Sequence, residues 1–134
     1  MQLKKIHTLE LYNISLIILL LVFLTPISAT AAVTGKYINA SGNTTVLEIS
    51  VDNPAPPSII VEQSPGNKNK VISANPRPKK VSGNGNVKWL LTNTRPGKQQ
   101  FTVTMADPLQ GSVRAILRYR DPANGQFIEK SITP

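Results

Sequence analysis

Apolar and polar side chains alternate in three consecutive runs between positions 86 and 121, and this pattern restricts the fold more than any other feature of the chain. In the second run Phe101, Val103 and Met105 take one face of an extended chain, while threonines take the other. Alternation at period two is typical of a half-buried strand, and no helical period fits these runs. Proline and glycine separate the runs. We therefore predict three consecutive strands that form the centre of one antiparallel sheet.

The amino-terminal residues have the composition of an export signal. Two lysines precede an apolar run, Ile14–Leu24, and small residues follow at Ala29–Ala31. The run is shorter than the roughly 20 residues that a membrane-spanning helix needs. We predict a signal peptide over residues 1–31, so that the mature protein is exported to the periplasm, the cell surface or the medium. The alternative is an uncleaved anchor over residues 11–33, which would have to carry an asparagine and a proline.

Cleavage would leave residues 32–134, a length that fits one domain with a modest core. The chain contains no cysteine, so this core has to hold without disulfides. Six to eight strands with close turns and no helix indicate an all-β antiparallel sandwich, with a small barrel as the alternative. Beyond the three central runs, strands are expected at residues 35–40, 44–52, 58–63 and 126–132, and short edge strands at 70–74 and 80–82.

The last hairpin allows its register to be predicted. A four-residue loop, residues 121–124, would place Leu117 opposite Ile128, whereas a five-residue loop would place Leu117 opposite Glu129. A slip of one residue exchanges the two faces of a strand. We therefore predict the shorter loop, which keeps apolar side chains opposite each other.

A series of strand and turn motifs runs through the middle of the chain. In order, the motifs are Asn53 at a strand end, Val61-Glu62, Pro65-Gly66, Trp89, Pro96-Gly97 and the threonine-rich strand Phe101–Met105. Over roughly residues 44–120, this series resembles the immunoglobulin-like repeat modules of bacterial and archaeal cell-surface proteins. The resemblance implies an Ig-like β-sandwich of about seven strands, with a spacer, stalk or adhesion role and no catalytic residues. A single copy is present, which favours a subunit or a binding module over a stalk.

One tryptophan is expected to anchor the core between the two sheets. Trp89 is in phase with Val87 and Leu91, and a core position is the usual place for such a side chain in a sandwich. The alternative is an exposed platform on which a carbohydrate ring stacks. The predicted core residues are Trp89, Leu91, Phe101, Val103, Leu117 and Tyr119.

A basic segment lies between Glu62 and Asp107, where the chain has no carboxylate. We interpret it as a candidate docking patch for an anionic glycopolymer, a lipid or an acidic partner. The alternative is a solvated surface that keeps the module soluble. Nucleic acid is disfavoured as a partner, because no aromatic residues interleave with these cations and the protein is exported. The members of the basic segment are Lys68, Lys70, Arg77, Lys79, Lys80, Lys88, Arg95 and Lys98.

A second group of cations, Arg114, Arg118 and Arg120, alternates along the third run and would share one strand face. An ordinary wet outer face is the commoner explanation of such a pattern, and an anion-binding strip is the alternative.

The residues argue against an enzyme. The single histidine, His7, lies in the predicted leader, so no imidazole would remain to activate a serine or threonine nucleophile. The carboxylates are scattered without metal-ligand spacing, and no cofactor or metal is expected. We expect an exported, non-enzymatic module that is a structural or accessory component of the cell surface or of an extracellular assembly. Its partners would be other surface or envelope proteins or further copies of itself, and the alternative is an envelope-binding module that holds anionic glycopolymer or lipid through the basic segment.

Overall fold

The computed structural model describes residues 32–134, which form nine strands and no helix. The predicted signal peptide, residues 1–31, and its cleavage site lie outside the described residues. Within the described part, no helix is therefore available to cross a membrane. The strands are β1 (Val33–Ser41), β2 (Thr44–Val51), β3 (Ser58–Ser64), β4 (Val71–Asn75), β5 (Lys80–Val81), β6 (Val87–Thr92), β7 (Gly97–Met105), β8 (Arg114–Arg120) and β9 (Phe127–Ile132).

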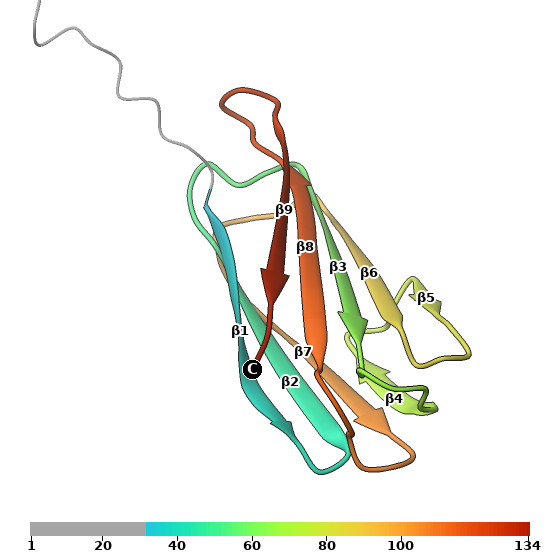
Figure 1. The fold of residues 1–134 in the computed structure, drawn as a ribbon. Coiled ribbons are helices and arrows are strands. Elements are labelled where there is room, and N and C mark those ends of the chain that lie inside the picture. The colour runs from blue at the N-terminus through green and yellow to red at the C-terminus, as the bar shows by residue number, and fades with distance from the viewer. Residues whose placement is uncertain (1–31) are drawn as a thin grey trace, which may run out of the picture.

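The strands form two antiparallel sheets that pack face to face (Figure 1). One sheet has the order β1-β2-β7-β4, and the other has the order β5-β6-β3-β8-β9. The prediction of an all-β antiparallel sandwich is confirmed, with nine strands where about seven were expected. The two short segments predicted as edge strands, β4 and β5, are each the last strand of a sheet on the same lateral side of the sandwich.

The prediction that the three central runs form the middle of one sheet is wrong. Strands β6 and β8 flank β3 in the five-stranded sheet, whereas β7 lies between β2 and β4 in the other sheet. Alternation gives each strand one apolar face but leaves open which sheet the strand joins. Both connections among the three central runs, from β6 to β7 and from β7 to β8, therefore cross between the sheets, and a backbone hydrogen bond holds each of them. Asn93 N donates to Pro57 O at 3.0 Å after β6, and Leu109 N donates to Gly42 O at 2.7 Å after β7.

The core fills the space between the two inner faces. Trp89 is 2% exposed, and its ring meets that of Phe101 edge-on, with 5.0 Å between the ring centroids. Leu91 is partly buried at the border of this core. Because side chains of both sheets meet in one cluster, the alternating runs of sequence become one continuous apolar layer. The buried hydrophobic residues are Val33, Leu47, Ile49, Val51, Ile59, Val61, Val87, Trp89, Phe101, Val103, Met105, Val113, Ala115, Leu117, Tyr119 and Ile132.

The register of the last hairpin differs by two residues from the prediction. Leu117 pairs with Lys130, and Ile128 pairs with Tyr119, so the connection spans residues 121–126. A shift of two residues keeps every side chain on its face, which is why the apolar pattern alone could not exclude it. The side chain of Lys130 makes the pairing favourable, since its ammonium lies 5.9 Å from the Tyr119 ring centroid and donates to Val33 O at 2.9 Å.

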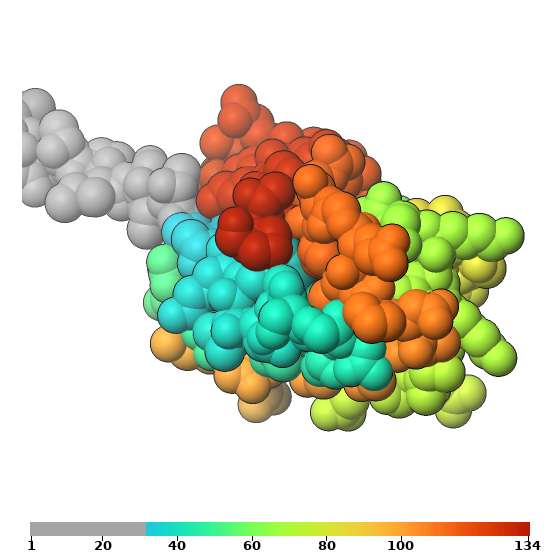
Figure 2. All heavy atoms as spheres, turned by 60° about the horizontal axis from the view of Figure 1, so that its bottom comes forward, coloured from blue at the N-terminus to red at the C-terminus, as the bar shows by residue number. Residues whose placement is uncertain are grey.

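A buried asparagine ties three loops together at one end of the sandwich. Figure 2 shows the loop that follows β7 lying between the β1–β2 hairpin and the loop that follows β3. Asn69 is 4% exposed, and its amide donates to Asp107 O at 3.0 Å. Its side-chain oxygen accepts from the backbone N–H of Lys70 and of Asp107, and Asn69 N itself donates to Asn84 O. The β5–β6 turn is thereby held against the end of the sandwich.

Candidate interaction site

The basic segment is carried by β4, β5, β6, the beginning of β7 and the connections between them. Strands β4 and β5 are the last strands of the two sheets on one lateral side of the sandwich, which we call the basic edge (Figure 1). This side is formed by β4, β5, β6 and the connection from β6 to β7. Lys68 and Lys70 precede β4 at one end, and Arg95 and Lys98 lie at the other end, around the start of β7. Consecutive parts of the chain lie on this side, because the chain crosses to the five-stranded sheet between β4 and β5 and returns to the four-stranded sheet between β6 and β7.

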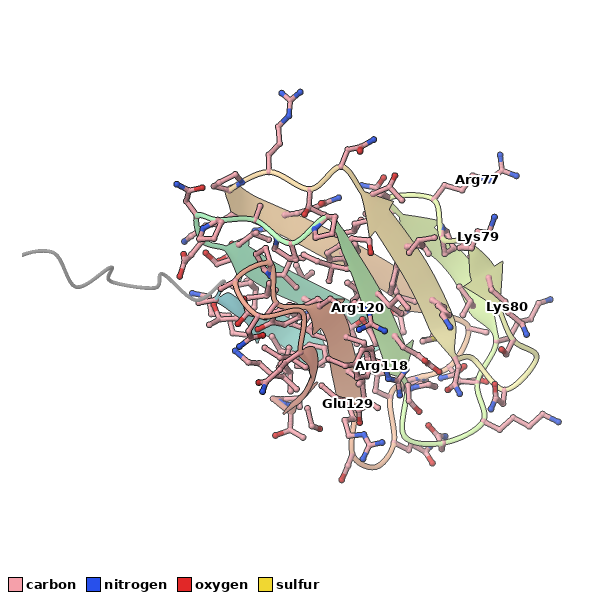
Figure 3. The ribbon with its side chains drawn as sticks, turned by 90° about the horizontal axis from the view of Figure 1, so that it is seen from above. Arg77, Lys79, Lys80, Arg118, Arg120 and Glu129 are labelled. Atoms are coloured by element: carbon pink, nitrogen blue, oxygen red, sulfur yellow. The ribbon has the colours of Figure 1, made fainter. Side chains whose placement is uncertain are left out.

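Four of these cations are close together in the middle of the basic edge. Lys80 pairs with Lys88 across the β5–β6 ladder, and Lys79 N donates to Lys88 O at 2.8 Å. Figure 3 shows Arg77, Lys79 and Lys80 projecting from the same side of the molecule, away from its body. All three side chains are exposed. The sequence had indicated a cationic stretch, and the fold makes it a compact group.

Carboxylates compensate little of this charge. Among residues 32–134, Lys98 is the one member of the basic segment that forms an ion pair, with 3.4 Å between its Nζ and Glu48 Oε1. Glu48 also lies 3.8 Å from Lys36. A hydrogen bond from Gln100 and then these two lysines hold the pKa of Glu48 below its ordinary value. The other seven members of the basic segment form no ion pair within the described residues, and together they create a positive field on this side.

The sandwich is open between the end of β6 and the beginning of β7. Two adjoining hollows, with volumes of about 450 and 300 Å³, share Leu90, Leu91 and Gln99 in their linings. The larger hollow reaches Arg95 at one end, and the smaller reaches Arg77 at the other. We call the two together the edge opening. Its lining is mixed: Leu90, Leu91 and Val51 supply apolar surface, the other residues of the β6–β7 connection are mostly polar, and a cation lies at each end.

Strand pairing is incomplete on both sides of the edge opening. In the described chain, β5 pairs with β6 at Val87 and Lys88 alone, so residues 89–92 have β3 as their one neighbour. Similarly, β4 pairs with residues 102–105 of β7, and residues 97–101 are paired with β2 alone. Unpaired strand edges present N–H and C=O groups that can extend a sheet with another strand.

Trp89 closes the inner end of this opening and is unsuitable as a stacking platform. Its indole N–H donates to Pro76 O at 2.8 Å, which fixes the start of the β4–β5 connection across the open side. With 2% of its surface exposed, its ring is covered on both faces. The expectation that this residue anchors the core matches its place in the structure, and the stacking alternative does not.

The arginines of β8 belong to a different surface. Arg118 donates to Glu129 at 2.7 Å and to Glu62 at 2.9 Å, and these two carboxylates raise the pKa of its guanidinium. Arg120 donates to Gly125 O at 3.2 Å. Figure 3 shows both arginines on the outer face of the five-stranded sheet, apart from Arg77, Lys79 and Lys80. The charge of Arg118 is compensated, whereas Arg114 and Arg120 form no ion pair within residues 32–134, so this strip has fewer uncompensated cations than the basic edge.

Two functional features of this side were missed at the level of sequence. Leu90 is 47% exposed, and it lies on the polar phase of its strand, between the inward-facing Trp89 and Leu91. An apolar residue out of phase is a signal that could have pointed to an exposed contact surface. The unpaired length of β7 carries no such signal, since it depends on where β4 ends. Within residues 32–134, no group of three or more histidine, cysteine or carboxylate side chains is placed to hold a metal ion.

No protein-family model matches the chain. No curated protein matches it in sequence either. The resemblance to Ig-like surface repeats therefore stays a prediction, and the site has to be interpreted from its own geometry.

Proposed function

We propose that the chain is an exported, non-enzymatic Ig-like module that serves as a structural or accessory component of the cell surface or of an extracellular assembly. The observation that carries the proposal is the edge opening, where the end of β6 and the beginning of β7, which belong to different sheets, have no outer neighbour within the described chain. A module that contacts other chains through its sheet edges needs such unpaired strands.

The strand order supports the Ig-like part of the proposal. An Ig constant-type sandwich pairs its first, second, fifth and fourth strands in one sheet and its third, sixth and seventh in the other. Strands β1, β2, β7 and β4 have the first arrangement, and β3, β8 and β9 have the second. The departure is β5 and β6, which follow β4 in the chain and add to the free side of β3. They also carry Trp89, which Ig domains have on the third strand.

The absence of a catalytic role is supported by the chemistry of the residues. The histidine at position 7 precedes the described domain, and the chain has no cysteine. The carboxylates Glu48, Glu62 and Glu129 are engaged with cations on the outer faces of the sheets. Glu62 and Glu129 share the guanidinium of Arg118, so neither is placed as a free general acid or base of the kind that hydrolysis by paired carboxylates requires.

The assembly role is tested by extracting native envelopes with mild detergent and separating the extract by size-exclusion chromatography. We expect the protein to elute in a larger complex, with chemical cross-links from Lys79 or Lys80 to a different protein. Elution as a free monomer, with no cross-linked partner, would overturn the assembly role.

An alternative function is that the basic edge binds anionic glycopolymer or lipid. It is favoured by the compact group of unpaired cations around Lys79. Replacing Arg77, Lys79 and Lys80 together by glutamine should leave the denaturation midpoint nearly unchanged, because exposed charges without partners contribute little to stability. If this alternative is correct, the triple variant attaches less to isolated envelopes, and moderate salt has the same effect on the unmodified protein. Attachment that resists both treatments argues for protein contacts instead.

A further inference from the structure

The geometry points to a β-strand addition site at the beginning of β7, and we propose that it takes an extended, acidic segment of a partner protein. The segment would pair with residues 97–101 and continue the line of β4. This inference rests on the proposed function and deepens it, because it names the contact and the chemistry of the partner.

Strand β7 loses its outer neighbour at the point where β4 ends. Strand β4 pairs with β7 until Asn75 lies opposite Thr102, and the chain then turns away at Pro76. Proline has no N–H to donate, so it cannot continue the ladder. The next part of β7 thereby loses its outer neighbour while it keeps β2 on its other side. An added strand would find a vacant position in a sheet whose geometry is already set.

Backbone N–H and C=O groups at the beginning of β7 point toward the vacant side. Met105 N donates to Asn43 on the β2 side, and Ala106 N donates to Lys70 on the β4 side. Successive residues of a strand present their N–H and C=O groups to opposite neighbours. Counting back along β7, the backbone groups of Lys98 and Gln100 point to the vacant side. An incoming strand would thus meet two donors and two acceptors at the spacing of an antiparallel ladder.

Part of the surface under the vacant position is apolar. Inward-facing side chains of an added strand would enter the edge opening, where Leu91 and Val51 supply apolar surface. Such a strand would therefore carry alternate apolar residues of moderate size. Backbone bonds would supply affinity, and these shallow contacts would supply register.

Charge selects the chemistry of the partner. Arg95 and Arg77 lie at the two ends of the edge opening, and neither has an ion-pair partner within residues 32–134. An acidic segment would gain attraction at both ends and a faster encounter. A second copy of this chain is disfavoured, because removal of the predicted leader lowers the formal charge only from +8 to +7. A glycopolymer would meet the cations, but it lacks the alternating N–H and C=O groups of a peptide strand and could not form a β-ladder with β7.

The test measures binding of a synthetic peptide with alternating glutamate and valine to the full chain. Three probes share one length: this peptide, the same peptide with N-methyl groups on alternate amides, and a peptide with lysine in place of glutamate. N-methylation removes the ladder donors and leaves the charge unchanged. We expect binding of the first peptide alone, with chemical-shift changes at the amides of Lys98 and Gln100.

The protein variants are Gln100→Pro and its control Gln100→Ala. Both remove the hydrogen bond from the Gln100 side chain to Glu48, and only proline removes the free N–H. Proline is tolerated at a strand edge that has no partner, and thermal unfolding of both variants checks the fold. Peptide affinity should fall at least about tenfold with proline relative to alanine. If proline prevents folding, the N-methylated peptide still decides the question.

Equal binding of the methylated peptide would overturn strand addition in favour of simple charge attraction. Absence of binding at about 1 mM peptide would overturn it as well, since the interaction would then be weaker than about 4 kcal/mol. Incorporation of Gln100→Pro into the native complex at the normal level would refute this site and leave the assembly role standing. Peptide binding by a protein that is monomeric in envelope extracts would refute the assembly role alone.

Discussion

Replacement of Gly85 by alanine should destabilise the domain by about 2–4 kcal/mol. Gly85 lies in the β5–β6 turn with a φ of 91°, a backbone conformation that side chains with a Cβ rarely adopt. A Cβ built at this position lies 2.6 Å from Asn69 O and 2.9 Å from the Pro65 ring. The first neighbour is backbone and is held by the loop contacts of Asn69, so it cannot simply turn aside.

Two other glycines allow the cost of the backbone conformation at Gly85 to be measured apart from the cost of the steric clash. At Gly42 the φ is 61° but a Cβ has no neighbour within 4 Å, so alanine there pays for conformation alone, about 1 kcal/mol. At Gly83 a Cβ also has open space, and the backbone is not in the left-handed region. Alanine at Gly83 should change the stability by less than about 0.5 kcal/mol. The expected order of destabilisation is Gly85, then Gly42, then Gly83.

Urea denaturation of the three variants, with one m-value for all, measures these differences as shifts in midpoint. The decisive comparison is between Gly85→Ala and Gly42→Ala. If the two variants lose the same stability, the close approach of the β5–β6 turn to the Asn69 loop does not constrain the domain. The contact between the Asn69 loop and the β5–β6 turn would then not be what holds this turn against the end of the sandwich.

Three further predictions concern the core and one surface carboxylate. Trp89→Ala should destabilise by about 3–5 kcal/mol, since it empties the largest buried side chain, and an unchanged midpoint would contradict its core position. The hydrogen bond from Gln100 is the main cause that holds the pKa of Glu48 below its ordinary value. The ionised Glu48 carboxylate therefore stabilises the folded domain above the ordinary pKa, and this contribution is lost as the pH falls through the lowered pKa. Between about pH 5 and pH 3 the wild type should therefore lose more stability than Glu48→Gln, and parallel pH profiles would contradict this. The buried side chain of Gln63 donates a hydrogen bond to the Thr45 hydroxyl between the sheets. Gln63→Leu alone should lower the free energy of unfolding by about 1–3 kcal/mol, because it leaves the buried hydroxyl without this partner. Adding Thr45→Val should recover most of this loss, and a double-mutant cycle measures the recovery.

The sequence predicted the class of fold because alternation determines the faces of strands. The inward phase of Trp89, Phe101 and Leu117 follows from the pattern, and all three are buried. Pairing does not follow from it, because β7 presents the same pattern whether it lies beside β6 or across the core from it. The two-residue error in the last hairpin has the same origin. The observed pairing of Leu117 with Lys130 depends on contacts of the lysine ammonium with Val33 O and with the Tyr119 ring, and the alternation within the hairpin does not indicate these contacts.

The candidate site was predicted in part. The run of cations was evident in sequence. Their position on one side of the sandwich follows from the pairing of β6 with β3 and of β5 with β6, and no local signal near Lys80 indicates this pairing. The edge opening exists because no strand of the described domain pairs with the outer side of residues 97–101 of β7. The absence of a neighbouring strand depends on how the whole sheet assembles, so no single segment of sequence can indicate it. Asn69 was also missed. A single asparagine in a polar loop gives no sign that it will be buried and bonded to two other loops.

The residues around the β5–β6 hairpin that could contact a partner are different from the residues that stabilise the domain. Between residues 76 and 84, every side chain is exposed or partly exposed. Mutations that add, remove or reverse charge in this stretch would therefore pass with little effect on folding, and selection could adjust the surface almost freely. A lineage could retarget such a module to a new partner in a few steps without first acquiring a more stable core. The same freedom makes this stretch the natural place for an engineer to graft a foreign recognition sequence.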